Sequence, residues 1–225
     1  MKQLMTYLGM ILFVAVMATS CKQAPKADKV EAEAPKKVAA AATTAKTMAV
    51  DVAKSQVTWV GTKPVGQHNG TIGVKSGSVD VTDGTVTGGK FVLDITSLKA
   101  TDMDEEGNGK LTDHLLADDF FDAEKFPEAS FEITGVAPYT EPADSTKKAL
   151  LAGATHNITG NLTLKGVSKS ITFPAKVNAG GAGVLANANF NIDRTQWGMN
   201  YGNDKSLKDR FIRPEVNIGL NLVAN

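Results

Sequence analysis

Ala186-Asn-Ala-Asn-Phe-Asn-Ile192 alternates apolar and polar side chains with a period of two residues. Val216-Asn-Ile-Gly-Leu-Asn-Leu222 follows the same pattern near the C-terminus. Successive side chains of a β-strand point to opposite faces, so each stretch predicts a strand with one apolar and one wet face. Similar patterns predict six further strands, near residues 56–63, 70–81, 91–95, 129–137, 156–165 and 171–177. The fold class is therefore expected to be all-β.

These segments favour an antiparallel β-barrel of about eight strands, because closure removes exposed sheet edges. A two-sheet sandwich would show the same alternation and stays open as an alternative. Pro174 cannot donate a backbone hydrogen bond, so it predicts an edge position or a bulge within its strand. Turns are expected at the glycine-containing pairs Asp83-Gly84, Gly88-Gly89, Lys165-Gly166 and Gly180-Gly181.

One segment breaks the β pattern: His114-Leu-Leu-Ala-Asp-Asp-Phe-Phe-Asp-Ala-Glu-Lys-Phe-Pro-Glu-Ala-Ser-Phe131. Together with Leu111, His114 and Leu115 show helical spacing, which predicts a short helix over about residues 110–117 with Asn108 as its N-cap. The acidic residues 102–108 before it are expected to form a mobile loop. Phenylalanines need burial, so we expect this insert to pack across one barrel end with Phe120 and Phe121 as structural anchors.

The N-terminal residues predict a targeting segment. Lys2 precedes an apolar run that ends in Ala18-Thr-Ser-Cys21, which is similar to a bacterial lipobox. We therefore expect residues 1–20 to be a lipoprotein signal peptide and Cys21 to carry the lipid that anchors the chain to a membrane. An ordinary secretory signal with a chance cysteine is the alternative. Residues 21–48 lack aromatic side chains and are expected to form a disordered tether, which leaves residues 49–225 as a single domain.

Charge and motif content argue for a binding protein. Residues 49–225 contain 17 Lys and Arg against 21 Asp and Glu, a net charge of about −4, which argues against nucleic acid as a partner. No nucleophile motif, phosphate loop or dinucleotide fingerprint is present, so no enzyme activity and no cofactor are expected. His68, His114 and His156 would suit a zinc site only if the fold brought them together, and separate imidazoles are the simpler interpretation.

A second aromatic and cationic cluster lies in Arg194-Thr-Gln-Trp-Gly-Met-Asn-Tyr201. Together with Trp59 and His68, these residues suit a barrel mouth that is apolar within and cationic at its rim. Alternatively, Trp197 and Tyr201 plug the barrel end, and Arg194 and Arg213 each pair with a nearby carboxylate such as Asp193 or Asp209. An eight-stranded barrel is just wide enough for either arrangement, so both interpretations stay open.

Several blocks resemble the YceI-like family in the right order along the chain. They are Trp59-Val-Gly-Thr-Lys-Pro-Val-Gly-Gln-His-Asn-Gly70, the Asp119-Phe-Phe-Asp122 and Lys125-Phe-Pro127 blocks, Gly160-Asn-Leu-Thr-Leu-Lys-Gly-Val167 and Arg194-Thr-Gln-Trp-Gly198. The first block and the lipobox look like the family's lipoprotein branch in Bacteroidetes-type bacteria. The resemblance implies an extended lipocalin-like barrel that is exported and binds polyisoprenoids or similar amphiphiles. It also implies that some members form homodimers.

The sequence and the resemblance together predict a carrier of a long apolar amphiphile, such as a polyisoprenoid or an isoprenoid quinone. Its expected place is the envelope of a Gram-negative-type bacterium, lipid-anchored on the periplasmic side. A filled barrel that acts as an envelope stress or adhesion factor without a lipid ligand is the alternative. The residues expected to contact the ligand are wall candidates and entrance candidates: Trp59, Phe91, Phe131, Phe173 and Phe190 for the wall, and His68, His114, Arg194, Trp197 and Tyr201 for the entrance.

Overall fold

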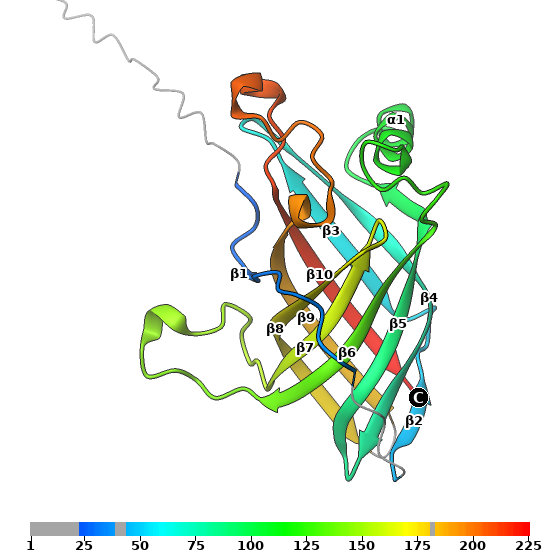
Figure 1. Ribbon diagram of the computed structural model, residues 1–225, viewed down its shortest axis with the longest axis vertical. Helices are drawn as coiled ribbons and strands as arrows, with labels where there is room; N and C mark the ends of the chain where they lie inside the picture. Colours follow the sequence, from blue (N-terminus) through cyan, green and yellow to red (C-terminus); the bar gives the residue numbers. More distant parts are fainter. Residues whose placement is uncertain (1–22, 39–43, 181–182) are drawn as a thin grey trace, which may run out of the picture.

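The computed structural model describes residues 23–38, 44–180 and 183–225, and eight of its strands form a closed barrel (Figure 1). All eight predicted strands are present, six of them longer than the alternation suggested and two, those near residues 56–63 and 156–165, one residue shorter. They are β3 (Gln56–Thr62), β4 (Gln67–Thr82), β5 (Thr85–Ala100), β6 (Glu128–Pro138), β7 (His156–Leu164), β8 (Val167–Gly180), β9 (Gly183–Asp193) and β10 (Glu215–Ala224).

The barrel has up-and-down topology. Each strand from β3 to β10 pairs antiparallel with the next one, and β10 pairs with β3 to complete the circle. In the closing pair, Ile218 lies opposite Trp59. The prediction of an eight-stranded antiparallel barrel is confirmed, and closure excludes the two-sheet sandwich.

Three of the four predicted turns lie within the described residues, and the fourth includes Gly181, which lies outside them. Asp83-Gly84 and Lys165-Gly166 turn with positive φ angles, as expected. Gly88-Gly89 does not turn, because both residues lie within β5 and pair with Asp80 and Val79 of β4. The prediction of a turn there is wrong, since glycine marks an irregularity in a long strand at this point.

β8 and β9 separate at Pro174. Their ladder runs from Ala175 opposite Ala188 to Gly180 opposite Gly183, and the part of β8 before Pro174 pairs only with β7 among the eight barrel strands. Proline has no N–H to offer a second neighbour, so the pairing ends where it stands. The predicted edge position of Pro174 is confirmed.

Residues 23–38, here called the N-terminal strap, lie in this opening. β1 (Asp28–Lys29) runs parallel to β9, and the Val30 N–H donates to Asn191 O at 2.9 Å. Glu33 and Ser170 of β8 exchange two backbone hydrogen bonds of 2.9 and 3.0 Å. Val30 is buried, so the strap supplies both an apolar contact and main-chain partners for the separated strand edges.

The expectation of a disordered tether over residues 21–48 is therefore wrong for the strap. It is also wrong for residues 46–48, because they lie in β2 (Lys46–Ala49), which pairs with β4. The composition of these segments predicted disorder because it offers few side chains that a core could bury. The backbone hydrogen bonds that hold them depend on no side-chain pattern. Residues 1–22, including Cys21 and the expected signal peptide, lie outside the described residues.

The helical insert is longer than predicted. Helix α1 spans Glu105–Leu116, and its N-cap is Asp104, whose Oδ1 accepts from Gly107 N–H at 2.8 Å. Asn108 lies inside the helix and bonds to the backbone of Met103, so neither the Asn108 cap nor the mobile loop over residues 102–108 is found. The helix contains Gly107 and Gly109, and because glycine has a low helix propensity, the sequence did not predict a helix over these residues. Among the described helices, none has the length and apolar character to span a bilayer.

Candidate ligand-binding cavity

The barrel encloses a cavity along much of its length. The empty space between its walls amounts to about 1920 Å³ when the part open to solvent is included. Its walls are apolar residues and one glycine apart from five polar side chains, namely Thr62, Lys63, His68, Asn187 and Arg194. Four of these five lie where β3, β4 and β9 meet the α1 end of the barrel.

The interior is hollow midway along the barrel. Phe91, Leu93, Phe131, Leu162 and Leu220 line the cavity, yet each is only partly buried. In a filled barrel, the inward side chains would pack against one another and would be fully buried. Their partial exposure is therefore exposure to the cavity itself.

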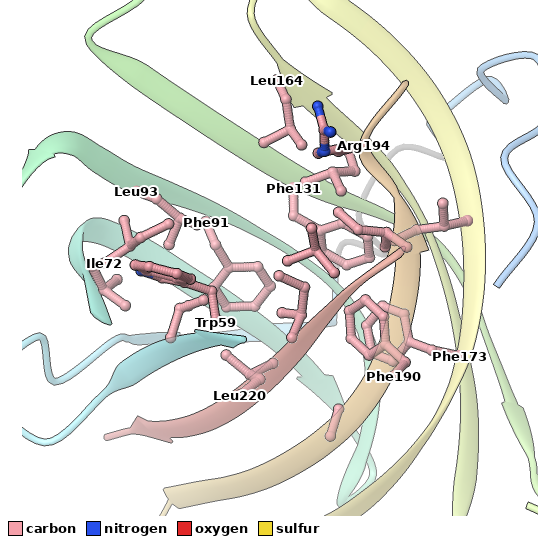
Figure 2. A pocket seen from close by; sticks show the side chains of 18 of the residues that line it. Trp59, Ile72, Phe91, Leu93, Phe131, Leu164, Phe173, Phe190, Arg194 and Leu220 are labelled. Carbon is pink, nitrogen blue, oxygen red and sulfur yellow. The ribbon is translucent and has the colours of Figure 1, made fainter. Parts of the chain in front are cut away.

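Four of the predicted wall residues form a continuous aromatic wall, defined as Phe91, Phe131, Phe173 and Phe190 (Figure 2). Phe91 stacks on Phe131 with ring centroids 6.4 Å apart, and Phe131 tilts against Phe173 at 5.6 Å. Phe173 and Phe190 stack at 4.3 Å. The wall thus spans β5, β6, β8 and β9 and crosses β7 at a glycine, Gly160.

A second aromatic cluster covers part of the α1 end, with Phe120 at its centre. The Phe120 ring contacts His114 at 5.1 Å, Tyr201 at 5.4 Å and the Arg194 guanidinium at 5.5 Å between centres. His114 also contacts Tyr201 edge-on at 4.6 Å and bonds to Asp119 Oδ2 at 2.9 Å. This Phe120 cluster joins the α1 insert to the connection between β9 and β10.

Arg194 holds that connection in place. Its guanidinium donates to four backbone carbonyls, those of Met199, Tyr201, Ile212 and Arg213. Burial lowers the pKa of Arg194 from its ordinary value, and the nearby charge of Asp193 opposes the change. Neither of the predicted ion pairs of Arg194, with Asp193 or Asp209, is found among the described salt bridges. Arg194 therefore stabilises the connection by hydrogen bonds to backbone carbonyls.

Seven of the ten predicted contact residues line the cavity: Trp59, His68, Phe91, Phe131, Phe173, Phe190 and Arg194. The other three do not. His114 and Tyr201 belong to the outer side of the Phe120 cluster, and Trp197 is buried with its Nε1–H donating to Leu162 O at 3.0 Å.

Sequence reasoning missed the cavity residues of the insert. Phe120 and Phe121, expected as anchors only, line the cavity, as do Leu111 and Leu115 of α1. The spacing of Leu111 and Leu115 did mark an apolar helix face, which was a usable signal. Nothing in the sequence indicated that this face closes a cavity.

The three histidines stand apart. His68 Nδ1 bonds to Asp102 Oδ2 at 3.0 Å, His114 bonds to Asp119, and His156 Nδ1 lies 2.9 Å from Thr155 Oγ1. Within the described part of the chain, no group of three or more His, Cys, Asp or Glu is placed to hold a metal ion. The imidazoles therefore serve separate local hydrogen bonds.

Solved structures share this architecture. The crystal structure of BcnA from Burkholderia cenocepacia is 25% identical, with a TM-score of 0.58, and the match covers 78% of this chain and 99% of that one. A polyisoprenoid binding domain from Saccharophagus degradans is 15% identical, with a TM-score of 0.55 over 79% of this chain and 97% of that one.

Two sequence relatives and one family model also match the chain. A UPF0312 protein of Pseudomonas putida strain W619 is 38% identical over 68 residues, which is 30% of this chain and 29% of that protein. A second one, from strain GB-1, is 37% identical over 68 residues and 29% of its length. The model of the YceI-like domain matches residues 48–224, which is the whole barrel. The chain therefore belongs to the YceI-like family.

Proposed function

We propose that this protein carries one long apolar amphiphile, such as a polyisoprenoid or an isoprenoid quinone, inside its barrel. The observation that carries the proposal is the hollow, apolar cavity whose polar lining gathers at the α1 end. The S. degradans neighbour, a polyisoprenoid binding domain with the same fold, supports a ligand of this chemistry.

Binding of such a chain needs no reacting group. Removing the chain from water contributes about 25 cal/mol for each Å² of apolar surface buried, so a long chain gains affinity along the aromatic wall. Lys63, His68 and Arg194 lie at the end where a polar head would stay. In this proposal the chain enters at the α1 end and the head remains near these three residues.

A non-catalytic role fits the cavity chemistry. His68 is the one imidazole in the described lining, and its Nδ1 is engaged by Asp102. The remaining lining is almost entirely hydrocarbon, which offers neither a nucleophile with a base nor donors around a reacting atom. Carriage is therefore the function we propose, without a chemical step.

We also propose that the barrel acts in the cell envelope, held to a membrane by a lipid on Cys21. The support is the lipobox-like Ala18-Thr-Ser-Cys21 motif after an apolar run. Metabolic labelling with a radioactive fatty acid tests this point: the wild-type chain should take up label and Cys21→Ser should not. Equal labelling of both chains would remove the anchor from the proposal.

The carrier function is tested by lipid extraction. The full chain is purified from a bacterial envelope, extracted with organic solvent, and the extract is analysed by mass spectrometry. We expect a long-chain lipid at close to one molecule per barrel. Its absence, together with no uptake of added polyprenol, would favour the alternative of a barrel that acts through its surface.

A further inference from the structure

The N-terminal strap starts at the α1 end of the barrel. Pro25 O accepts a hydrogen bond of 3.0 Å from Asn191 Nδ2, close to the end of β9. Residues 23–27 lie beside Arg213 and Glu215, where β10 starts. Figure 1 shows the strap, in blue, running from there across the outside of the barrel. The start of the strap and α1 therefore share one end of the barrel.

The proposed lipid would be attached close to this end. Cys21 precedes Gln23 by two residues. A chain spans at most about 3.6 Å per residue, so the two α-carbons lie within about 7 Å of each other. The strap itself is fixed to the barrel through backbone hydrogen bonds of Val30 and Glu33. A lipid on Cys21 would therefore hold the bilayer near the α1 end without a long tether between them.

Two loops project beyond the strands at this end, and we name them the mouth loops. They are residues 63–66, at the tip of the hairpin between β3 and β4, and residues 204–210 of the connection between β9 and β10. Figure 1 shows them in cyan and orange. A hydrogen bond of 2.9 Å from Arg213 N to Thr62 O joins the bases of the two loops. They can therefore meet a flat surface together.

The mouth loops present an apolar tip among cations. Val65 has an exposed fraction of 71%, the largest of any exposed large hydrophobic residue in the described chain. Four cations and two carboxylates accompany it, a net charge of +2: Lys63, Lys205, Lys208, Arg210, Asp204 and Asp209. Among the described ion pairs, none involves the four cations. An exposed apolar side chain among Lys and Arg suits contact with anionic headgroups.

Helix α1 carries the opposite charge. Asp104 caps the helix, and Glu105 and Glu106 form its first turn. All three are exposed, and Lys110 pairs with Glu106 at 2.5 Å. Anionic headgroups repel carboxylates, so the α1 side of the barrel end should stay in water while the mouth loops approach the lipid. The charge difference across this end therefore favours one tilt of the barrel on a membrane.

We infer that the mouth loops are a docking surface for an anionic lipid bilayer, with Val65 among the headgroups and α1 in water. The inference rests on the proposed lipid on Cys21 and the proposed carriage, and it adds the orientation in which the barrel meets the membrane. The end at which the carried chain enters then lies against the bilayer. A long apolar chain can pass between the two with little of its surface exposed to water, which is the unfavourable part of such a transfer.

Fluorophores on single cysteines test this orientation in the full lipidated chain. A lipid on Cys21 leaves the wild-type chain without a free thiol, because Cys21 is its only cysteine. Val65→Cys, Glu105→Cys and Val52→Cys each add one thiol at an exposed position. Val52 is the matched control, since it lies at the opposite end of the barrel, two residues after the bridge between Val50 and the last residue of β10.

Each labelled chain is bound to vesicles of phosphatidylglycerol and phosphatidylethanolamine. We expect the fluorophore at residue 65 to emit at shorter wavelength and to be quenched by spin-labelled lipid. The fluorophores at residues 105 and 52 should be quenched by iodide in the water instead. In vesicles of phosphatidylcholine, the shift at residue 65 should shrink, because the four cations of the mouth loops lose their anionic partners.

The outcomes separate the inference from the proposed function. Equal iodide quenching at residues 65 and 52 would overturn the docking surface while the anchor stands. Lipid quenching at residue 105 as strong as at residue 65, or a shift that is the same in phosphatidylcholine, would overturn the role given to charge. A free thiol in the wild-type chain would overturn the anchor and the inference with it. The lipid content of the same preparation tests carriage separately.

Discussion

The ring of Phe131 lies against the bare α-carbon of Gly160 on the neighbouring strand, in the space that a side chain would fill. This contact lets Phe131 cross β7 and reach Phe173 on β8. The aromatic wall is continuous because one strand between its members carries no side chain at that point.

Gly160→Ala should therefore destabilise the barrel. The new methyl group would overlap the Phe131 ring, and overpacking of this kind costs about 1–3 kcal/mol. The midpoint of thermal unfolding should fall by roughly 2–12 °C in a chain of this size. Gly61→Ala is the matched control, since nothing lies within 4 Å of a Cβ there. Equal melting temperatures for the two variants would contradict the packing described at Gly160.

A large side chain at residue 61 should block the cavity and spare the fold. Gly61 lines the cavity near the α1 end, with open space in front of its α-carbon. In Gly61→Phe, the ring would occupy the path of a bound chain, so uptake of a fluorescent polyprenol analogue should fall about tenfold or more. Circular dichroism should stay unchanged. Undiminished uptake would mean that the ligand does not pass this point.

Arg194→Met should loosen the connection between β9 and β10. Four carbonyls lose a charged donor, and we expect the free energy of unfolding to fall by at least about 2 kcal/mol in denaturant titration. Arg194→Lys should lose nearly as much, because an ammonium group cannot reproduce the planar fork of donors. Arg210→Met, at an exposed position, is the control. Full stability of Arg194→Lys would show that charge alone is what this position supplies.

The strap should detach when Val30 becomes charged. Val30→Asp places a carboxylate where the wild-type side chain is buried, and a charge without a partner there is unfavourable. Release of the strap frees the Ser170 N–H from Glu33 O, so its hydrogen exchange should accelerate about tenfold or more. Lys29→Ala, at an exposed neighbour, serves for comparison. Unchanged exchange at Ser170 would indicate that the strap does not close this edge.

The barrel could be predicted because apolar and polar side chains alternate along each of its strands. In β9, the apolar set that includes Ala188, Phe190 and Ile192 faces the interior, while Asn191 faces outward and is covered by the strap, with its Nδ2 donating to Pro25 O. An inward face read from the sequence also identified the four wall phenylalanines. Element ends were less accurate, since β5 continues through Gly88 and Gly89.

The strap and the Trp59 environment could not be predicted, for a shared reason. The strap is held by backbone groups of Glu33 and Ser170, more than a hundred residues apart, and backbone pairing leaves no side-chain signature. The fit of Trp59 over Gly70 depends on strand register. His114 and Tyr201 were predicted to contact the ligand, but they lie on the outer side of the Phe120 cluster. Their aromatic and polar character does not indicate which side of that cluster they occupy.

Carriage of one long apolar chain in the cavity can be tested by native mass spectrometry of the full chain, purified from a bacterial envelope beside Gly61→Phe. We expect a wild-type population heavier by the mass of one long-chain lipid, and a Gly61→Phe population that lacks this added mass. A wild-type chain that carries no lipid, and takes up none when polyprenol is added, would rule out the proposed carriage.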